Sequence, residues 1–477
     1  MICFAVFQCY AFSTLYAQAG KEKLNSLIEE LRSNRDLRGA TISLKAVDMS
    51  TGKEVYAYQS NINMIPASLQ KLVTTGAGFI VLGSNYRFST LLACSGTLVD
   101  STLTGNIYII GGGDPVLGSD SFRQTVPDSL FSRFRQALKR KGVNSFNGSI
   151  IPVAARLEAA RIHPSWEWED IGSYYGTGAS GLNFHENSFT LRLKAEGMSP
   201  EKLSMTGDLP ASCIIAQSIV PVHADSACDL TVYSSPLSMN YLVAGNLPSS
   251  GREYKVDAAL SSPENECAER FVRFLAERGF PGGYFAGETM YDYPDEQFDT
   301  VYVETSPRYA DLAKRCNKHS NNLYAESIFK SIAGMSETEP SFKTCAGIIT
   351  ALLKNRGLNT DGIRIVDGSG LSRRNFMTAD FMCEYLRMIA VAVPDFETYL
   401  PAAGEGTLQT FMSGYKTRNR VRLKSGSMSG VLNYAGYVKN SHNRTVCLTI
   451  MLNNFTCKSG VARRKIEQIV DLIAEIN

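Results

Sequence analysis

The chain has 477 residues, of which 44% are hydrophobic and 20% charged, and its formal net charge is +2. This is the composition of an ordinary globular protein and excludes a disordered chain, and a length of 477 residues predicts two or three domains. The small net charge, without a long basic run, provides no electrostatic basis for nucleic acid, which we exclude as a partner.

The first nineteen residues carry no charge, are mostly apolar and end in Ala17-Gln18-Ala19. An apolar segment that ends in small residues is typical of a secretory signal peptide, so we expect residues 1–19 to direct export to the periplasm or cell envelope. Gln8, Ser13 and Thr14 interrupt a stretch that is already at the short limit for spanning a bilayer. We therefore expect at most a peripheral association with a membrane.

The hydrophobic periodicity predicts that both ends of the mature chain contribute to one sheet with helices packed on it. At the N-terminal end it predicts an amphipathic helix over 23–34, a hairpin of strands over 40–47 and 54–58, and a helix over 67–80. At the C-terminal end it predicts strands near 420–424, 432–438 and 445–452 and a final helix over 461–475.

The long middle of the chain predicts domains of its own, because it is far longer than a loop requires. Strands are expected near 105–110 and 148–153, helices near 128–141 and 263–278, and a strand-like stretch without helices over 185–250. We predict a discontinuous main domain of residues 20–95 and 288–477, an inserted α+β domain of 96–184 and 251–287, and a second inserted, mostly β domain of 185–250.

The motif Ser68-Leu69-Gln70-Lys71 opens the helix predicted over 67–80. In a helix, positions 68 and 71 lie one turn apart on one face, so the Lys71 amine can reach the Ser68 hydroxyl. A serine needs an adjacent base to act as a nucleophile, and a lysine can supply it if burial and neighbouring cations lower its pKa. The motif therefore predicts a nucleophile and its base.

The same Ser-x-x-Lys spacing begins at four other serines, Ser50, Ser199, Ser327 and Ser413. A solvated serine and lysine on the surface is the ordinary explanation of such a pair. Ser50 lies in a turn-like stretch, and a proline or a glycine follows Ser199 and Ser413. Ser327 also lies in a helical pattern, but only Ser68 stands at the start of an apolar helix.

Two further polar motifs follow, Ser320-Asn321-Asn322 and Lys424-Ser425-Gly426. Lys424 ends a strand-like run, and Gly426 leaves room for a substrate backbone along the strand edge. The backbone N–H groups of Ser68 and Ser427 can then form an oxyanion hole. A second Lys-Ser-Gly, at 458–460, precedes the C-terminal helix and lacks this setting.

The three motifs in this order are found in penicillin-binding proteins and class A β-lactamases. The chain resembles the D-alanyl-D-alanine carboxypeptidase/endopeptidase family, the class C low-molecular-weight penicillin-binding proteins. Longer motifs of that family are present as Gly111-Gly112-Gly113-Asp114-Pro115, as Asp367-Gly368-Ser369-Gly370-Leu371-Ser372-Arg373 and between Tyr175 and Asn187, so the resemblance covers almost the whole chain. Asn321 stands where the family often has aspartate, and Ser425 where it often has threonine.

The resemblance implies a multidomain fold of the α/β and α+β classes. The catalytic domain would be β-lactamase/transpeptidase-like, with an antiparallel sheet flanked by helices, and would carry two inserted domains, the inner one mostly β. The implied activity is that of a serine-type D-alanyl-D-alanine carboxypeptidase or DD-endopeptidase, which acts on peptidoglycan stem peptides through an acyl-enzyme on Ser68 and is inhibited by β-lactams. No cofactor is implied.

The resemblance also implies roles for the polar residues. Lys71 would take the proton of Ser68, and Ser320 and Lys424 would pass a proton to the leaving amine. Asn322 would orient the acyl amide, while Lys424 and Ser425 would bind the terminal carboxylate.

Three alternatives stay open at this point. A β-lactamase on the same fold would use the same motifs, although such an enzyme is normally a compact single domain, and an esterase would use them as well. A non-catalytic peptidoglycan-binding protein would have no reason to keep all three polar motifs. The sequence leaves open the balance between carboxypeptidase and endopeptidase activity and the oligomeric state.

Asp170 and Arg373 are candidates for substrate selection. Many stem peptides contain diaminopimelate, whose side chain carries both an ammonium and a carboxylate. We expect Asp170 to bind the ammonium and Arg373 the carboxylate, with Tyr175 and Met428 as walls of the pocket. The alternative is that Asp170 caps a turn and Arg373 forms a structural salt bridge.

Cysteine and histidine give no sign of a metal site. Nine of the eleven cysteines lie after residue 19, and neither they nor the five histidines have the spacing of metal ligands. An odd number of cysteines without paired spacing also argues against a disulfide framework. We expect no metal, and expect most cysteines to be small buried apolar residues.

Overall fold

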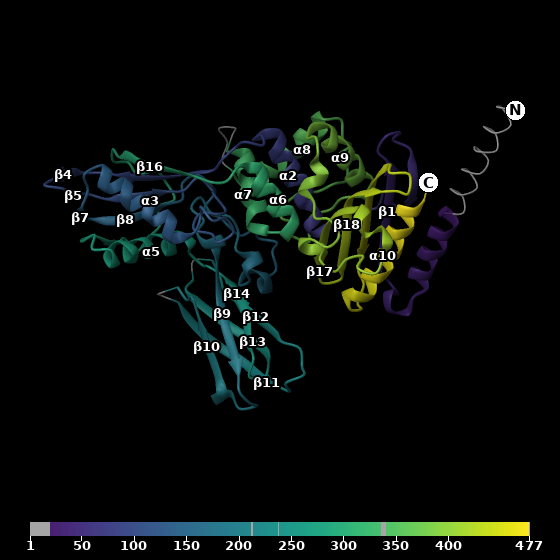
Figure 1. Cartoon of the computed structure of the whole chain (residues 1–477), viewed down its shortest axis with the longest axis horizontal. Coiled ribbons are helices and arrows are strands. Elements are labelled where there is room, and N and C mark those ends of the chain that lie inside the picture. The colour runs from purple at the N-terminus through teal and green to yellow at the C-terminus, as the bar shows by residue number, and fades with distance from the viewer. Residues whose placement is uncertain (1–19, 211–212, 237, 335–339, 477) are drawn as a thin grey trace. The chain divides into compact units, whose positions relative to one another are not determined.

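The computed structural model describes residues 20–210, 213–236, 238–334 and 340–476. The predicted signal peptide, residues 1–19, lies outside the described residues. The chain divides into two compact units, each with its own sheets and core (Figure 1). The first unit runs to Gly83 and includes 310–321 and 346–477, and the second consists of 84–309 and 322–345.

The first unit is built on one antiparallel five-stranded sheet in the order β17-β18-β19-β1-β2. Its N-terminal strands are β1 (Thr41–Asp48) and β2 (Glu54–Tyr58). Its C-terminal strands are β17 (Val421–Met428), β18 (Val431–Lys439) and β19 (Thr445–Asn453). The prediction that both ends of the chain share one sheet is confirmed, and β17 continues four residues beyond the predicted strand end at 424.

Successive side chains of each strand point to opposite faces of this sheet, and apolar side chains on both faces have to be buried. Helices therefore cover both faces. On one face, the helix over residues 20–33 and the C-terminal helix α10 (Ser459–Glu475) pack on Leu44, Leu448 and Ile450. On the other face lies α9 (Ala379–Ala392), where the Cys383 thiol contacts the Thr449 hydroxyl across 3.3 Å. Figure 1 shows α10 and α9 against the strands of this unit.

The nucleophile motif lies between the sheet and α9. It consists of a 3-10 turn, η2 (Ala67–Leu69), followed directly by α2 (Gln70–Val81). The other helices that contribute to this unit are η1 (Arg35–Leu37), α6 (Tyr309–His319), α8 (Phe342–Asn355), η6 (Phe396–Tyr399), η7 (Gly406–Leu408) and η8 (Lys416–Arg420).

The second unit contains a mixed five-stranded sheet in the order β15-β8-β6-β3-β16. The strands are β3 (Ser89–Cys94), β6 (Ile107–Ile110), β8 (Ser149–Val153), β15 (Tyr284–Phe285) and β16 (Asp299–Thr305). The helices α3 (Pro127–Arg140) and α5 (Pro263–Glu277) pack on it through an aromatic core that includes Phe131, Phe134 and Phe271. A small sheet of β4 (Thr97–Val99), β5 (Thr102–Thr104) and β7 (Ser145–Asn147) is part of the same unit.

Two three-stranded sheets, β10-β9-β14 and β11-β13-β12, enclose a separate apolar core in the second unit. Their strands are β9 (Ser188–Ala195), β10 (Leu203–Gly207), β11 (Ile214–Val222), β12 (Asp229–Tyr233), β13 (Asn240–Pro248) and β14 (Glu253–Ala259). The short helices of this unit are α4 (Trp168–Ile171), η3 (Tyr174–Gly176), η4 (His185–Asn187) and η5 (Pro200–Lys202), and α7 (Asn322–Ala333) also belongs to it.

The predicted fold class, a multidomain protein of mixed α and β structure, is confirmed. The predicted division into three domains stays a prediction, and the borders of the two units differ from it. Strands β3 and β16 pair with each other in the sheet of the second unit, so residues 84–95 and 288–309 lie with that unit. The sequence assigned both stretches to the main domain because β3 and β16 lie more than 200 residues apart along the chain, beyond the reach of local patterning.

The packing of α2 against α9 leaves no room for a side chain at Gly76, because a Cβ there would overlap the Tyr385 hydroxyl, which donates to Leu72 O at 2.9 Å. We predict that Gly76→Ala lowers the free energy of unfolding by about 1–3 kcal/mol, the usual cost of overpacking a core. Gly347 in α8 is exposed with no neighbour within 4 Å, so Gly347→Ala should instead be neutral or stabilise by about 0.4–1 kcal/mol. Urea unfolding of both variants measures the difference. An unchanged free energy of unfolding in Gly76→Ala would contradict the close packing of α2 against α9.

Candidate active site

Ser68 and Lys71 face each other at the start of α2. Ser68 lies in the 3-10 turn η2, so the helix predicted over 67–80 begins as a regular α-helix only at Gln70. The Lys71 Nζ atom lies 2.8 Å from Ser68 Oγ, and the Lys71 side chain is completely buried. A buried amine in contact with a serine hydroxyl is the arrangement that nucleophile activation requires.

A second hydrogen bond holds Lys71 in place, since its Nζ atom donates to Ser369 O at 2.7 Å. Ser369 belongs to a loop that the buried Asp367 carboxylate organises. Asp367 accepts from the backbone N–H of Gly370 at 2.9 Å and of Ser372 at 2.7 Å, and from the Asn375 amide at 2.8 Å. In the sequence this motif is recognisable as a family signature, but nothing in it indicates that the Ser369 carbonyl binds Lys71.

Ser320 and Lys424 form the second hydroxyl and amine pair of the first unit. Lys424 Nζ donates to Ser320 Oγ at 2.9 Å and to Ser425 O at 2.6 Å. Burial of Lys424 lowers the pKa of its ammonium well below the ordinary value, and the positive charge of Lys71 lowers it further. The two lysines are therefore near enough to repel each other when both are charged.

The strand edge next to Ser68 admits only a glycine at position 426. A Cβ on Gly426 would lie 2.7 Å from Pro66 O and 3.1 Å from Ser68 N. β17 is an edge strand of the sheet, and Asn433 on its neighbour β18 donates to Ile65 O at 2.9 Å and Pro66 O at 3.0 Å. These contacts dock the nucleophile turn on the strands that carry the third motif.

The predicted substrate-binding residues of the first unit lie along β17 and the turn after it. Ser425, Gly426, Ser427 and Met428 are its last four residues. Arg373 Nη2 donates to Ser429 O at 3.1 Å, which brings the end of the Asp367 motif to this turn. Ser425 Oγ donates to Thr407 Oγ1 at 2.8 Å, although nothing in the sequence singles out Thr407 as a site residue. The oxyanion hole of Ser68 and Ser427 stays a prediction.

Three predicted site residues lie together in the second unit. Asn322 is the first residue of α7, and its Nδ2 atom donates to Tyr175 O at 2.8 Å. Burial raises the pKa of the Tyr175 hydroxyl, and the charge of Asp170 and a hydrogen bond to it raise it as well. Asn322, Tyr175 and Asp170 are therefore neighbours, although 146 residues separate Tyr175 from Asn322 in the chain.

The competing motifs lie in other surroundings. Ser50 Oγ donates to Asp48 Oδ1 at 2.6 Å within a turn, and Lys458 is the N-cap residue of α10. In α7, Ser327 is buried and Lys330 donates to Ala160 O at 2.8 Å, while burial lowers the pKa of Lys330 to about 8. Lys330 is therefore buried as Lys71 is, but Ser327 is completely buried whereas Ser68 is only half-buried. Ser327 also lies in the middle of a helix rather than before its first turn.

Among residues 20–476, apart from the short undescribed gaps, no cluster of three or more His, Cys, Asp or Glu side chains could hold a metal ion. All nine cysteines that the structure describes are free thiols, and six of them are buried, as predicted for most of them. No helix in the described part of the chain combines the length and apolar character that crossing a membrane requires.

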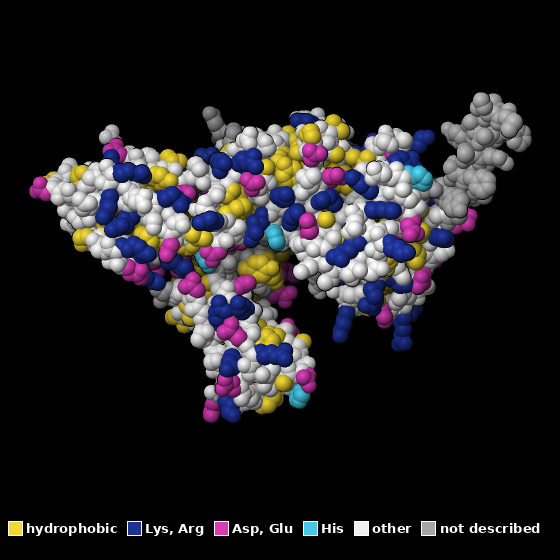
Figure 2. Space-filling view, in the orientation of Figure 1, with side chains coloured by type: hydrophobic (Ala, Val, Ile, Leu, Met, Phe, Trp, Pro, Cys, Tyr) yellow, Lys and Arg dark blue, Asp and Glu magenta, His cyan; other side chains and the backbone are white. Residues whose placement is uncertain are grey.

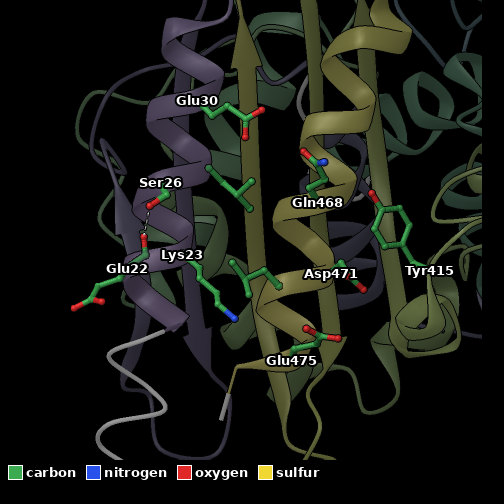
Figure 3. A pocket seen from close by; sticks show the side chains of 10 residues that line it. Glu22, Lys23, Ser26, Glu30, Tyr415, Gln468, Asp471 and Glu475 are labelled. Atoms are coloured by element: carbon green, nitrogen blue, oxygen red, sulfur yellow. Dashed lines mark hydrogen bonds between the residues drawn. The ribbon is translucent and has the colours of Figure 1, made fainter.

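A groove of about 710 Å³ lies elsewhere in the first unit, between the helix over 20–33 and α10 (Figure 3). Its labelled side chains include Glu22, Glu30, Asp471 and Glu475 (Figure 3). These two helices cover the sheet face opposite α9, so the groove is separate from the Ser68 turn. On the face of the molecule shown in Figure 2, lysine and arginine side chains are interspersed with acidic ones rather than gathered in one patch.

Known proteins resemble this chain in both sequence and fold. The family model described as D-Ala-D-Ala carboxypeptidase 3 (S13) matches residues 24–476. The D-alanyl-D-alanine carboxypeptidase of Actinomadura sp. (strain R39) is 27% identical over 449 residues, 89% of this chain and 81% of that protein. The D-alanyl-D-alanine carboxypeptidase DacB of Haemophilus influenzae is 24% identical over 427 residues, 88% of this chain and 86% of that protein.

The crystal structure of penicillin-binding protein 4 from Haemophilus influenzae has the same fold, with a TM-score of 0.82 at 22% identity over 95% of this chain and 99% of that one. A crystal structure of the same protein complexed with a novel β-lactam matches with a TM-score of 0.75 at 23% identity over 94% of this chain and 98% of that one.

The repulsion between the two lysines leads to a prediction about Lys424. Replacing Lys71 by methionine removes its positive charge, so the pKa of Lys424 should rise. It should stay below 10.5, because burial still disfavours the ammonium. NMR titration of ¹³Cε-labelled lysine measures the change, and Lys458→Met serves as the control that leaves the Lys424 titration where it was. A pKa of Lys424 that is unchanged or lower in Lys71→Met would refute the coupling.

Proposed function

The chain belongs to the D-Ala-D-Ala carboxypeptidase 3 (S13) family, and from this premise we propose that it is a serine peptidase that cleaves the peptide bond next to D-alanine in peptidoglycan stem peptides. The reaction passes through an acyl-enzyme on Ser68. The observation that carries the proposal is the buried Lys71 amine 2.8 Å from the Ser68 hydroxyl, in the first of three motifs with the family's order.

Acylation begins when Ser68 Oγ attacks the carbonyl carbon of the penultimate D-alanine and Lys71 Nζ takes its proton. Lys71 must be uncharged to accept this proton. The hydrogen bond that it donates to Ser369 O keeps the amine beside the Ser68 hydroxyl until the transfer occurs. The backbone N–H groups of Ser68 and Ser427 receive the negative charge that develops on the carbonyl oxygen. The open edge of β17 gives the extended substrate a strand to pair with.

Departure of the leaving group needs a proton on its amine nitrogen. Ser320 Oγ supplies that proton and recovers it from Lys424, whose Nζ lies 2.9 Å away. The lowered pKa of Lys424 supports this role, because an ammonium that loses its proton more easily is a better acid near neutral pH. Lys424 and Ser425 also bind the terminal carboxylate, and Asn322 orients the acyl amide.

Export and inhibition belong to the same proposal. Peptidoglycan lies outside the cytoplasmic membrane, so the apolar, uncharged residues 1–19 would serve as the signal that takes the enzyme to the periplasm or cell envelope. β-Lactams would acylate Ser68 in place of a stem peptide, as the Haemophilus influenzae structure with a bound β-lactam supports for a protein of this fold.

Substrate selection by Asp170 and Arg373 remains part of the proposal. The two residues lie in different units, Asp170 beside Tyr175 and Arg373 beside the turn after Met428. Asp170 offers a carboxylate to the diaminopimelate ammonium, and Arg373 offers a guanidinium to its carboxylate.

A labelled β-lactam should form a covalent adduct on Ser68 and on no other serine, and mass spectrometry of the labelled peptide identifies the site. In Lys71→Ala and Lys424→Ala the rate of acylation should fall by orders of magnitude. When catalytic residues act together, removing one of the proton-transfer groups costs nearly as much as removing the nucleophile.

Lys458→Ala and Ser327→Ala are the matched controls, since they remove the competing lysine and serine. Both should label at close to the wild-type rate. Labelling of a Ser68→Ala protein, or equal losses in Lys424→Ala and Lys458→Ala, would show that the motifs were assigned to the wrong residues. A rapidly released adduct would favour a β-lactamase.

The diaminopimelate pocket is tested by Asp170→Asn. Losing one charge-assisted hydrogen bond costs roughly 1.5–3 kcal/mol, so turnover of a diaminopimelate peptide should fall by a factor of about 10 to 150. Acylation by benzylpenicillin, which has no such ammonium, should change much less. Glu169→Gln removes the neighbouring exposed carboxylate and should leave both rates unchanged. Equal losses of both activities in Asp170→Asn, or no loss, would remove Asp170 from the pocket.

A further inference from the structure

Thr407 is tied to the third motif by a hydrogen bond between hydroxyl groups. Ser425 Oγ on β17 donates to Thr407 Oγ1 at 2.8 Å. Ser425 is partly buried, whereas Thr407 is an exposed residue of the short turn η7. The exposed threonine therefore directs its hydroxyl toward a residue of the proposed site, although solvent is available to it.

The chain segment before Thr407 is fastened along the first half of β17. Leu423 N donates to Pro401 O at 3.2 Å, and Ala403 N donates to Val421 O at 3.1 Å. Among the described residues, no strand pairs with this edge of β17 from Lys424 onward. Thr407 thus stands where the covered part of the edge gives way to the part that a substrate strand would occupy.

Two further contacts set the position of the turn. Leu408 is completely buried in the core of the first unit, and Glu405 pairs with Lys318 across 2.6 Å. Lys318 lies in the last turn of α6, two residues before Ser320. Gly406 has a φ of +49°, and a Cβ there would overlap Lys318 O. The backbone that carries Thr407 is therefore packed against the segment that carries Ser320.

The Ser425 side chain by itself has little to restrain its rotamer. A threonine, which the family often has at this position, is stiff at χ1 because its Cβ is branched, and a serine lacks the extra methyl group. A hydroxyl has one proton and two lone pairs, so Ser425 can accept from Thr407 while it donates to another acceptor. The hydrogen bond to Thr407 can thus supply the orientation that the missing methyl group would have given.

We propose that Thr407 is a positioning residue for substrate binding: it holds the Ser425 hydroxyl in the rotamer that donates to the carboxylate of the leaving D-amino acid. In the free enzyme Ser425 donates to Thr407. When the carboxylate binds, the Ser425 proton turns to a carboxylate oxygen and Thr407 donates its own proton to Ser425 Oγ. This inference rests on the proposed function, because it assumes a substrate with a terminal carboxylate.

The test compares two substrates of the full-length enzyme, an acetylated peptide that ends in diaminopimelate-D-Ala-D-Ala and the corresponding diaminopimelate-D-Ala methyl ester, whose leaving group has no carboxylate. Thr407→Val keeps the shape and removes the hydroxyl. It should lower kcat/KM for the peptide roughly three- to ten-fold, mainly through KM, and leave the ester within about two-fold. Thr407→Ser should restore the peptide activity.

The double variant Ser425→Thr/Thr407→Val gives a result that a general structural role would not. A threonine at 425 restrains its own hydroxyl, so the double variant should recover most of the peptide activity that Thr407→Val loses. Thr410→Val, an exposed threonine close by in the chain, is the control and should match the wild type in both rates and in thermal unfolding.

The outcomes separate this inference from the proposed function. A wild-type enzyme that cleaves the ester but not the peptide, or neither, would refute the proposed function. If the wild type cleaves both, an unchanged Thr407→Val variant, or one that loses both activities equally, overturns the role of Thr407. A double variant that stays as impaired as Thr407→Val overturns it as well, because the rotamer argument requires the recovery.

Discussion

The buried amine of Lys71 is the interaction on which the rest of the site depends. Its two hydrogen bonds, to Ser68 Oγ and to Ser369 O, join the start of α2 to a loop almost 300 residues later in the chain. A buried polar group is costly unless it is bonded, so neither segment can move away without leaving this amine unsatisfied. The Asp367 carboxylate, which organises the loop, therefore acts on the nucleophile through Lys71.

The residues around this amine have unusual backbone conformations, and a neighbouring lysine has an unusual pKa. Two residues of the site have a positive φ: Ala67, which precedes Ser68, at +46°, and Ser320 at +57°. Such conformations cost free energy and persist where the surrounding contacts enforce them, as the bonds from Asn433 to the turn before Ser68 do. The charge of Lys71 also lowers the pKa of the buried Lys424, so the lysine of the first motif influences the lysine of the third.

Much of the first unit could be predicted from local patterns. The hairpin, the last strands and the terminal helix follow from alternation and helical periodicity, because each of these elements shows one apolar face to a common core. The borders of the second unit could not be found in this way. β3 and β16 are paired only in the folded chain, and nothing in either stretch indicates which sheet it joins.

The sequence by itself determined the order and spacing of the proposed catalytic residues: a serine and a lysine one helical turn apart, followed by Ser320 and by Lys424 in the family's order. The spacing and order of the motifs are properties of the covalent chain, so they can be recognised without a three-dimensional structure. Only the tertiary structure decided which neighbours those residues have. The Ser369 carbonyl and the Thr407 hydroxyl are common groups without a local signature, and they reach the site because segments that are distant in the chain pack together.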